Sequence, residues 1–149
     1  MIQPFDDEYF MRKALQEANL AFDKGEVPVG AVIVLNNQII ARAHNLTETL
    51  NDVTAHAEMQ AFTAAADFLG GKYLKECVLY VTLEPCQMCA GASYWTQLKK
   101  IVFGASEPER GFINLQTKLH PKTTVLSNVL ENECSEILKR FFIEKRNLN

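Results

Sequence analysis

The sequence predicts an α/β fold, a three-layer α/β/α sandwich around a central mixed sheet of about five strands. Segments with apolar residues at helical spacing alternate along the chain with short segments rich in β-branched and aromatic residues. The first two strand segments are separated only by Asn36 and Asn37, so we expect an antiparallel pair beside strands that helices connect. No repeat or long linker divides the 149 residues, and we therefore expect one domain over 1–149.

The chain begins with a predicted helix followed by a hairpin. Apolar residues recur at helical spacing over 5–23, and Gly25 follows where glycine commonly ends a helix. The runs GAVIVL (30–35) and QIIARAH (38–44) are predicted strands. Asn36-Asn37 between them favours a tight turn, because asparagine tolerates a positive φ.

The rest of the chain alternates between predicted helices and strands. HAEMQAFTAAADFL has helical spacing and stops at two glycines, whereas CVLYVTL is rich in β-branched residues and too short for a helix. The last segment is amphipathic with a basic end. In order, we expect a helix over 56–69, a strand over 77–83, a helix over 88–98, strands over 99–105 and 123–127, and a helix over 129–146.

Composition narrows the class of protein. Hydrophobic residues make up 48% of the chain and charged residues 22%, as in soluble globular domains. The net charge of −3 gives no global sign of a polyanionic partner. No apolar run approaches the roughly 20 residues of a membrane span, and the N-terminus lacks the apolar core of a signal peptide. We therefore expect a cytoplasmic protein without membrane association.

Two short motifs carry the chemistry, His56-Ala57-Glu58 and Pro85-Cys86-Gln87-Met88-Cys89. Cys86 and Cys89 stand three residues apart at a strand-to-helix junction, a spacing that turns both sulfurs toward one point. His56 begins its own predicted helix, so two helix N-termini are expected to meet. One histidine and two cysteines are three zinc ligands that leave a fourth position for water, as in a catalytic site.

Glu58 completes this group of functional residues. It lies two residues after His56, and a carboxylate beside a zinc-bound water is placed to take a proton, since the metal lowers the pKa of water to about 7. A Cys-x-x-Cys pair alone also suits a redox couple or half of a structural zinc site. The structural site would need Cys77 and Cys134, which are not spaced as a second pair and are expected to be buried thiols.

At these residues the sequence resembles the zinc nucleoside and nucleotide deaminases, whose signature is H-x-E followed by P-C-x-x-C. The closer similarity is to the bacterial tRNA adenosine deaminases, through EVPVGAVIV, HNLTETLNDVTAHAE, LYVTLEPCQMCAGA, KIVFGA, HPKT and ECSEILKRFF in the same order. The resemblance covers nearly the whole chain. It implies a cytidine deaminase-like fold, one zinc ion per subunit, a homodimer, and conversion of adenosine to inosine at the wobble position of a tRNA anticodon stem-loop.

The same resemblance assigns roles to residues. It implies that His56, Cys86 and Cys89 hold the zinc ion and that Glu58 moves protons. It further implies that a set of pocket residues contacts the substrate: Asn45, Val27, Ala57, Leu83, Phe141 and Phe142. From the residues alone, Asn45 can equally cap or turn the chain, and the two phenylalanines can be core side chains of an amphipathic helix.

Two features depart from the tRNA-acting relatives. The loop after Asn45 has no Lys or Arg, and the segment EPERGFINLQTK is shorter. Phosphate contacts would then come from basic residues in the second half of the chain: Lys99, Lys100, Arg110, Lys118, Lys122, Lys139, Arg140, Lys145 and Arg146. Two alternatives stay open. A deaminase of free guanine or cytosine would share every metal residue, and a zinc-stabilised binding module would share the ligands without a use for Glu58.

Overall fold

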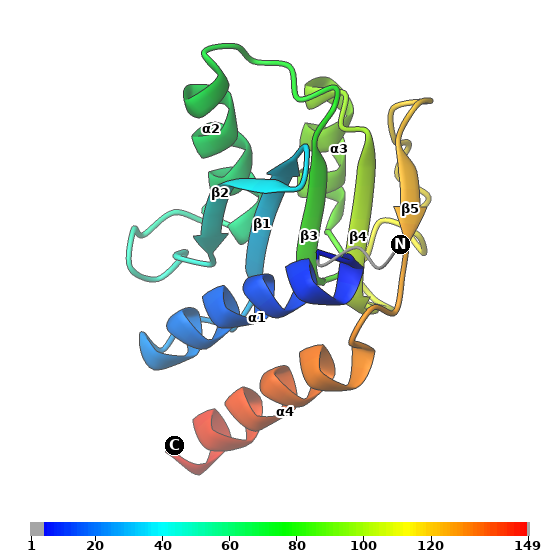
Figure 1. The fold of residues 1–149 in the computed structure, drawn as a ribbon. Coiled ribbons are helices and arrows are strands. Elements are labelled where there is room, and N and C mark those ends of the chain that lie inside the picture. The colour runs from blue at the N-terminus through cyan, green and yellow to red at the C-terminus, as the bar shows by residue number, and fades with distance from the viewer. Residues whose placement is uncertain (1–4, 149) are drawn as a thin grey trace.

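The computed structural model describes residues 5–148 and shows a five-stranded sheet between two layers of helices (Figure 1). Helices α1 and α4 cover one face of the sheet, and α2 and α3 cover the other. The predicted α/β/α sandwich is confirmed. Its elements are α1 (Asp7–Asp23), β1 (Gly30–Leu35), β2 (Gln38–His44), α2 (Ala57–Leu69), β3 (Val78–Leu83), α3 (Gln87–Thr96), β4 (Lys100–Ala105), β5 (Thr124–Leu126) and α4 (Glu131–Asn147).

The sheet is mixed, with the strand order β2-β1-β3-β4-β5. Strand β1 pairs antiparallel with β2 and with β3, whereas β3, β4 and β5 run parallel. Asn36 and Asn37 have φ values of 51° and 62°, the left-handed conformation that the two-residue turn between β1 and β2 requires. Because β3 and β4 are parallel, their carboxyl ends lie at the same edge of the sheet, and the segments after them start side by side.

Strand β1 fills the core on both sides of the sheet. Ala31 and Ile33 pack in the cluster beneath α2 and α3, and Val32 and Val34 pack in the cluster beneath α1 and α4. All four side chains are buried. Successive residues of a strand point to opposite faces, so an uninterrupted apolar run is what a strand covered on both sides requires.

Two glycines let α1 and α4 approach the sheet closely. A Cβ at Gly30 would overlap the backbone of α1 at Ala14, and a Cβ at Gly104 would overlap the side chain of Cys134 on α4. Both positions therefore require the smallest residue. Neither of these helices, nor any other helix within residues 5–148, is long and apolar enough to cross a membrane.

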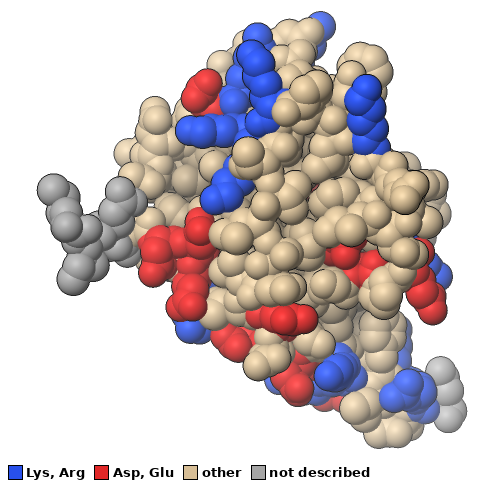
Figure 2. Space-filling model, turned by 90° about the vertical axis from the view of Figure 1, so that its right-hand side faces the viewer, with Lys and Arg blue, Asp and Glu red and all other residues tan. Residues whose placement is uncertain are grey.

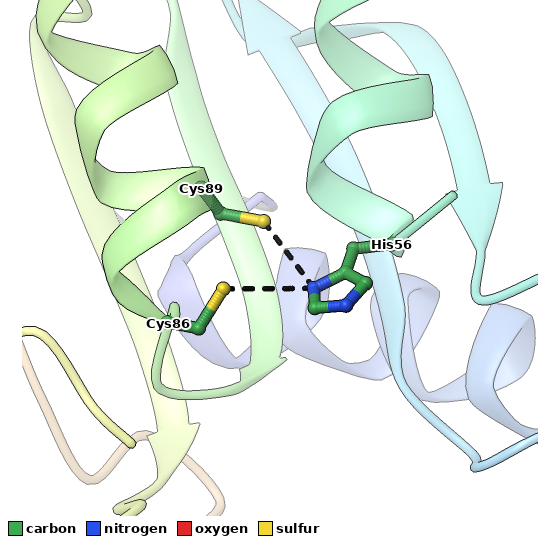
Figure 3. Close-up of side chains that lie close together, drawn as sticks. All are labelled: His56, Cys86 and Cys89. Carbon is green, nitrogen blue, oxygen red and sulfur yellow. Dashed lines mark hydrogen bonds between the residues drawn. The ribbon is translucent and has the colours of Figure 1, made fainter. Parts of the chain in front are cut away.

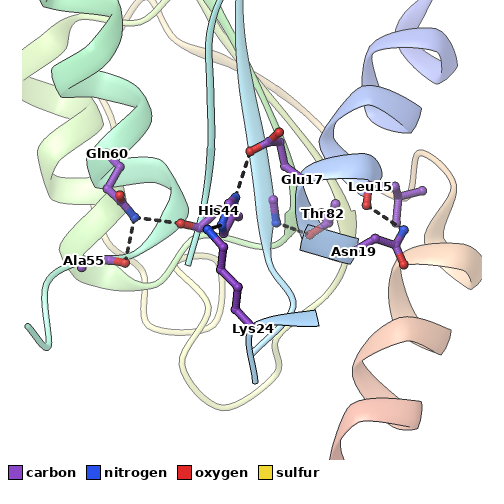
Figure 4. Close-up of polar contacts among 9 residues, drawn as sticks. Leu15, Glu17, Asn19, Lys24, His44, Ala55, Gln60 and Thr82 are labelled. Carbon is purple, nitrogen blue, oxygen red and sulfur yellow. Dashed lines mark hydrogen bonds and ion pairs between the residues drawn. The ribbon is translucent and has the colours of Figure 1, made fainter. Parts of the chain in front are cut away.

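Polar contacts fix the end of β2 and the loop that follows it (Figure 4). Nδ1 of His44 lies 2.9 Å from Oε1 of Glu17, and its Nε2 lies 2.9 Å from Nζ of Lys24. Nε2 of Gln60, on α2, donates to the carbonyl oxygens of His44 (2.8 Å) and Ala55 (3.2 Å). Helix α2 thereby holds both ends of the loop that leads from β2 to its own first turn.

Candidate active site

The three predicted metal ligands meet between the first turns of α2 and α3 (Figure 3). His56 immediately precedes α2 and Cys86 immediately precedes α3, both with extended backbone (ψ of 156° and 173°). Cys89 lies in the first turn of α3, where the three-residue spacing brings its sulfur to the same side as that of Cys86. The positive ends of both helix dipoles therefore point at the group and stabilise thiolates.

The spacing of the ligand atoms fits one zinc ion. Nδ1 of His56 lies 3.6 Å from Sγ of Cys86 and 3.5 Å from Sγ of Cys89. All three atoms lie within 4.8 Å of one another. A tetrahedral zinc ion with Zn–N and Zn–S bonds of about 2.0 and 2.3 Å separates such ligands by about 3.6 Å. This His-Cys-Cys group can therefore hold one zinc ion and leaves a fourth position for water.

The group favours the thiolate form of one of its cysteines, Cys86, whereas the hydrogen bond to Cys86 and burial raise the pKa of the Cys89 thiol. The pKa of Cys86 lies well below its ordinary range, because its thiolate accepts a hydrogen bond from Cys89 and is further stabilised by His56. The pKa of His56 is raised, chiefly by its hydrogen bond with Cys86. Cys86 is thus a thiolate at neutral pH, which is the form that binds zinc.

Glu58 lies in the first turn of α2 beside this group and is only 4% exposed. Among residues 5–148, the clustered ligand atoms come from His56, Cys86 and Cys89, without a contribution from Glu58. Burial raises the pKa of the Glu58 carboxyl to about 7. A carboxyl group with a pKa near neutrality can both accept and donate a proton at physiological pH.

The metal group borders a pocket of about 380 Å³, within the usual size range of small-molecule sites. His56, Glu58 and Cys86 contribute to its lining. Five of the residues expected to contact substrate line it as well: Val27, Asn45, Ala57, Leu83 and Phe142. The pocket therefore brings these five side chains and the metal group into one site.

The two phenylalanines of α4 lie in different surroundings. Phe142 lines the pocket and is 47% exposed. Phe141 does not line the pocket; it is 6% exposed and packs against Phe22 of α1, with ring centroids 5.8 Å apart. Neighbouring helical residues point about 100° apart, so only one of the two can face the pocket while the other enters the core.

The side chain of Asn45 turns the chain where β2 ends and also borders the pocket. Its Nδ2 donates to the carbonyl oxygen of Val27 (3.3 Å), and its Oδ1 accepts from the amide of Thr47 (3.3 Å). The side chain is 7% exposed and lines the pocket. It therefore turns the chain after β2 and joins two other residues of the pocket wall.

Sequence reasoning missed much of the wall that follows β4. Ser106 and Glu107 line the pocket, and so does Glu84, the last residue before Pro85. A signal for this wall exists, because residues that follow two adjacent parallel strands meet at one edge of the sheet. Three further lining residues also had no assignment from sequence: Val29, Thr47 and Leu138.

The basic residues expected to contact phosphate fall into separate places. Arg110 lines the pocket, and α4, which supplies Phe142, also carries Lys139, Arg140, Lys145 and Arg146. Lys99, Lys100 and Lys122 instead lie where β4 and β5 begin, at the opposite end of the sheet. Figure 2 shows Lys and Arg gathered at that upper end of the molecule. Of the basic residues expected to contact phosphate, Arg110 lines the pocket itself, and Lys139 and Arg146 share a neighbouring hollow with Phe142.

Residues 5–146 match the family model described as MafB19-like deaminase. The tRNA-specific adenosine deaminase of Bacillus subtilis (strain 168) is 48% identical over 146 residues, covering 94% of this chain and 91% of that protein. A solved structure from work on A-to-I editing by tRNA:A34 deaminases has a TM-score of 0.83 and 42% identity, covering 87% of this chain and 99% of that chain. The structure of guanine deaminase from Bacillus subtilis has a TM-score of 0.65 and 41% identity, covering 68% of this chain and 65% of that chain.

The fold and the metal group are those of the zinc-dependent hydrolytic deaminases, which combine one histidine and two cysteines with a glutamate that is not a ligand. The match over residues 5–146 and the 48% identity over nearly the full length of both chains are more specific. This chain belongs to the family of the tRNA-specific adenosine deaminases.

Proposed function

We propose that this protein deaminates adenosine to inosine at the wobble position of a tRNA anticodon. The observation that carries the proposal is the meeting of the His-Cys-Cys group, the buried Glu58 carboxyl and the pocket of about 380 Å³ in one place. The similarity to tRNA-specific adenosine deaminases supports adenosine in tRNA as the substrate.

In this mechanism three residues hold the metal and a fourth moves protons. His56, Cys86 and Cys89 bind the zinc ion, which when bound supplies a Lewis acid that makes water a nucleophile near neutral pH. Glu58 takes a proton from the attacking water and gives it to the ring nitrogen next to C6 of adenine. It then helps to protonate the departing amino group, so that adenosine and water yield inosine and ammonia.

The pocket suits a base that has left its stack. Val27 and Leu83 offer apolar contact to the ring, and the amide of Asn45 offers hydrogen bonds to its edge. Phe142, which is half exposed, is available to stack on a neighbouring nucleotide. The wobble base lies in a single-stranded loop, so the cost of moving it into a pocket is small. Arg110 is placed to contact a phosphate.

A deaminase of free guanine is the second candidate, and the 41% identity to a guanine deaminase over the matched part of the chain favours it. Such an enzyme would use the same metal group and the same glutamate. It would have no use for a basic helix end beside an exposed Phe142, because a free base has no phosphate. That feature of α4 supports an RNA substrate.

The deciding experiment offers RNA and free bases to the same zinc-loaded protein. One reaction contains an anticodon stem-loop with adenosine at the wobble position; others contain free guanine, cytosine or adenosine. We expect inosine at the wobble position of the RNA, measured by mass spectrometry of the digested nucleosides, and no ammonia from the free bases. A stem-loop with its adenosine moved into the paired stem is the control. Ammonia from guanine without inosine in the RNA would support the second candidate.

We further propose a homodimer located in the cytoplasm. The family resemblance supports the dimer, and the single chain leaves large apolar side chains such as Val53 and Trp95 at 84% and 76% exposure. Sedimentation should give about twice the 16.8 kDa mass of one chain. A substrate in tRNA supports a cytoplasmic location, and cell fractionation with an antibody to the protein tests it.

A further inference from the structure

One wall of the pocket, residues 106–113, contains no helix or strand and is tied to the metal motif by Glu84. Oε1 of Glu84 accepts the amide of Glu107, and Oε2 accepts the amide of Ile113, both at 3.0 Å. The two bonds enter the segment near its beginning and at its end. The Glu84 side chain is 5% exposed, so both carboxylate oxygens are spent inside the protein on this one segment.

Backbone contacts bring the last part of the same segment to the metal ligand Cys86 and the residue before it. The amide of Phe112 donates to the carbonyl oxygen of Pro85 (2.9 Å), and Gly111 forms an isolated antiparallel bridge with Cys86. A Cβ at Gly111 would overlap the carboxylate of Glu84. The carboxylate is therefore packed between the segment and the residues that lead into α3.

Position 84 is better suited to glutamate than to glutamine or aspartate. The amide groups of Glu107 and Ile113 need two acceptors. An ionised carboxylate has two acceptor oxygens and no donor. A glutamine of the same shape keeps one oxygen and turns its NH₂ group toward the second amide, which leaves two donors facing each other. An aspartate is one methylene shorter and does not reach as far from the backbone.

We propose that Glu84 is a positioning residue, which sets the pocket wall 106–113 and thereby governs the affinity for substrate. The wall it holds brings Ser106, Glu107 and Arg110 to the pocket. The proposal rests on the proposed function, because it assigns this wall to the binding of RNA. It predicts an effect on KM, whereas Glu58 acts on the chemical step.

The test uses zinc-loaded Glu84→Gln. Hydrogen exchange at the amides of Glu107 and Ile113 should become about tenfold faster than in the natural protein, because one bond is lost and the other weakened. KM for the anticodon stem-loop should rise about tenfold, with kcat within about twofold and the zinc content unchanged. Glu76→Gln is the matched control, since it removes the same charge from an exposed side chain before β3 and should change none of these quantities.

Two further variants make the test decisive. Gly111→Ala pushes a methyl group into the carboxylate of Glu84 and against the backbone oxygen of Glu107, so it displaces the same wall. It should raise the exchange rates and KM in the same way, and it replaces Glu84→Gln if that variant does not fold. Glu26→Gln should speed exchange at Glu48 and Thr49 instead, because Glu26 binds those amides. Unchanged exchange at Glu107 and Ile113, or a fall in kcat at unchanged KM, would overturn the proposal.

The exchange measurement needs no substrate, so it tests the role of Glu84 independently of the proposed function. A natural protein that leaves the stem-loop unmodified refutes the proposed function. The exchange rates at Glu107 and Ile113 would still show whether Glu84 positions the wall. Loss of zinc from Glu84→Gln would mean that Glu84 acts through Cys86, and would also overturn the proposal.

Discussion

The hydroxyl of Thr49 donates a hydrogen bond of 2.6 Å to Oε2 of Glu26, a side chain with no exposed surface. The same carboxylate accepts the amides of Glu48 (3.0 Å) and Thr49 (2.7 Å). These bonds hold the loop over 45–55, which carries part of the pocket wall and ends at the metal ligand His56. Without this carboxylate the loop would lose the acceptor of two amides and one hydroxyl.

We predict that Glu26→Gln lowers the free energy of unfolding by about 2 kcal/mol at pH 7, since a buried acceptor of three hydrogen bonds is replaced by a group that is partly a donor. Thr49→Val removes only the hydroxyl and should cost about 1 kcal/mol. Urea unfolding of the zinc-loaded proteins measures both values. Equal stability of Glu26→Gln and the natural protein would show that the loop is held by other contacts.

The stability that Glu26 contributes should also depend on pH. Burial alone raises the pKa of this carboxyl, but the hydrogen bonds from Thr49 and Glu48 outweigh it, so the pKa lies below 4.5 in the folded protein. A group whose pKa is lowered by folding stabilises the protein above its unfolded pKa and loses that contribution as the pH falls through the folded value. The stability difference between the natural protein and Glu26→Gln should therefore be full at pH 7 and shrink below about pH 4.5.

We predict that Glu58→Gln keeps its zinc and loses deamination. The substitution preserves the shape of the buried side chain but removes its ability to accept and return a proton, so kcat should fall by at least about 100-fold. Metal analysis should still find one zinc ion per chain, because Glu58 is not in the ligand group. His56→Ala is the contrasting variant and should lose the metal. Zinc loss from Glu58→Gln would make this residue a ligand and refute its assignment as proton shuttle.

The elements and the metal group could be predicted because each depends on chemistry within a few residues. Asn36-Asn37 specifies a turn through its own φ preference, and the structure has that turn. Cys86 and Cys89 face one point because they stand one helical turn apart. Only the approach of His56 to the cysteines depends on the tertiary fold. That approach was predicted from the joint occurrence of the H-x-E and P-C-x-x-C motifs.

The second pocket wall could not be predicted, because it depends on contacts between distant segments. Glu84 meets residues that lie 23 and 29 positions further along the chain. No local pattern indicates which amides a glutamate will bind. The orientation of α4 is a similar case, since an amphipathic pattern allows either Phe141 or Phe142 to face the core, and the packing against Phe22 decides between them.

We predict that Cys86→Ser lowers zinc affinity by more than about 100-fold, because a serine hydroxyl is a poor substitute for a thiolate ligand. Cys134→Ser is the matched control. Cys134 is fully buried on α4, and burial raises the pKa of its thiol to about 12, so it stays protonated. This control should lose about 1–2 kcal/mol of stability by burying a hydroxyl and keep its zinc. Titration with a chelating dye measures the affinities, and zinc loss from Cys134→Ser would contradict the assignment.

The last prediction separates the two phenylalanines of α4. Phe142→Ala should raise KM for the anticodon stem-loop about tenfold, the loss expected for one stacked base, and change the free energy of unfolding by less than about 0.5 kcal/mol. Phe141→Ala should have the opposite profile, because its ring is buried against Phe22: about 3 kcal/mol of stability lost, with KM of the folded protein within about twofold. Unfolding curves and steady-state kinetics at a temperature where both variants are folded provide the two numbers. An equal rise of KM in both variants would mean that α4 contributes to RNA binding as a whole rather than through Phe142.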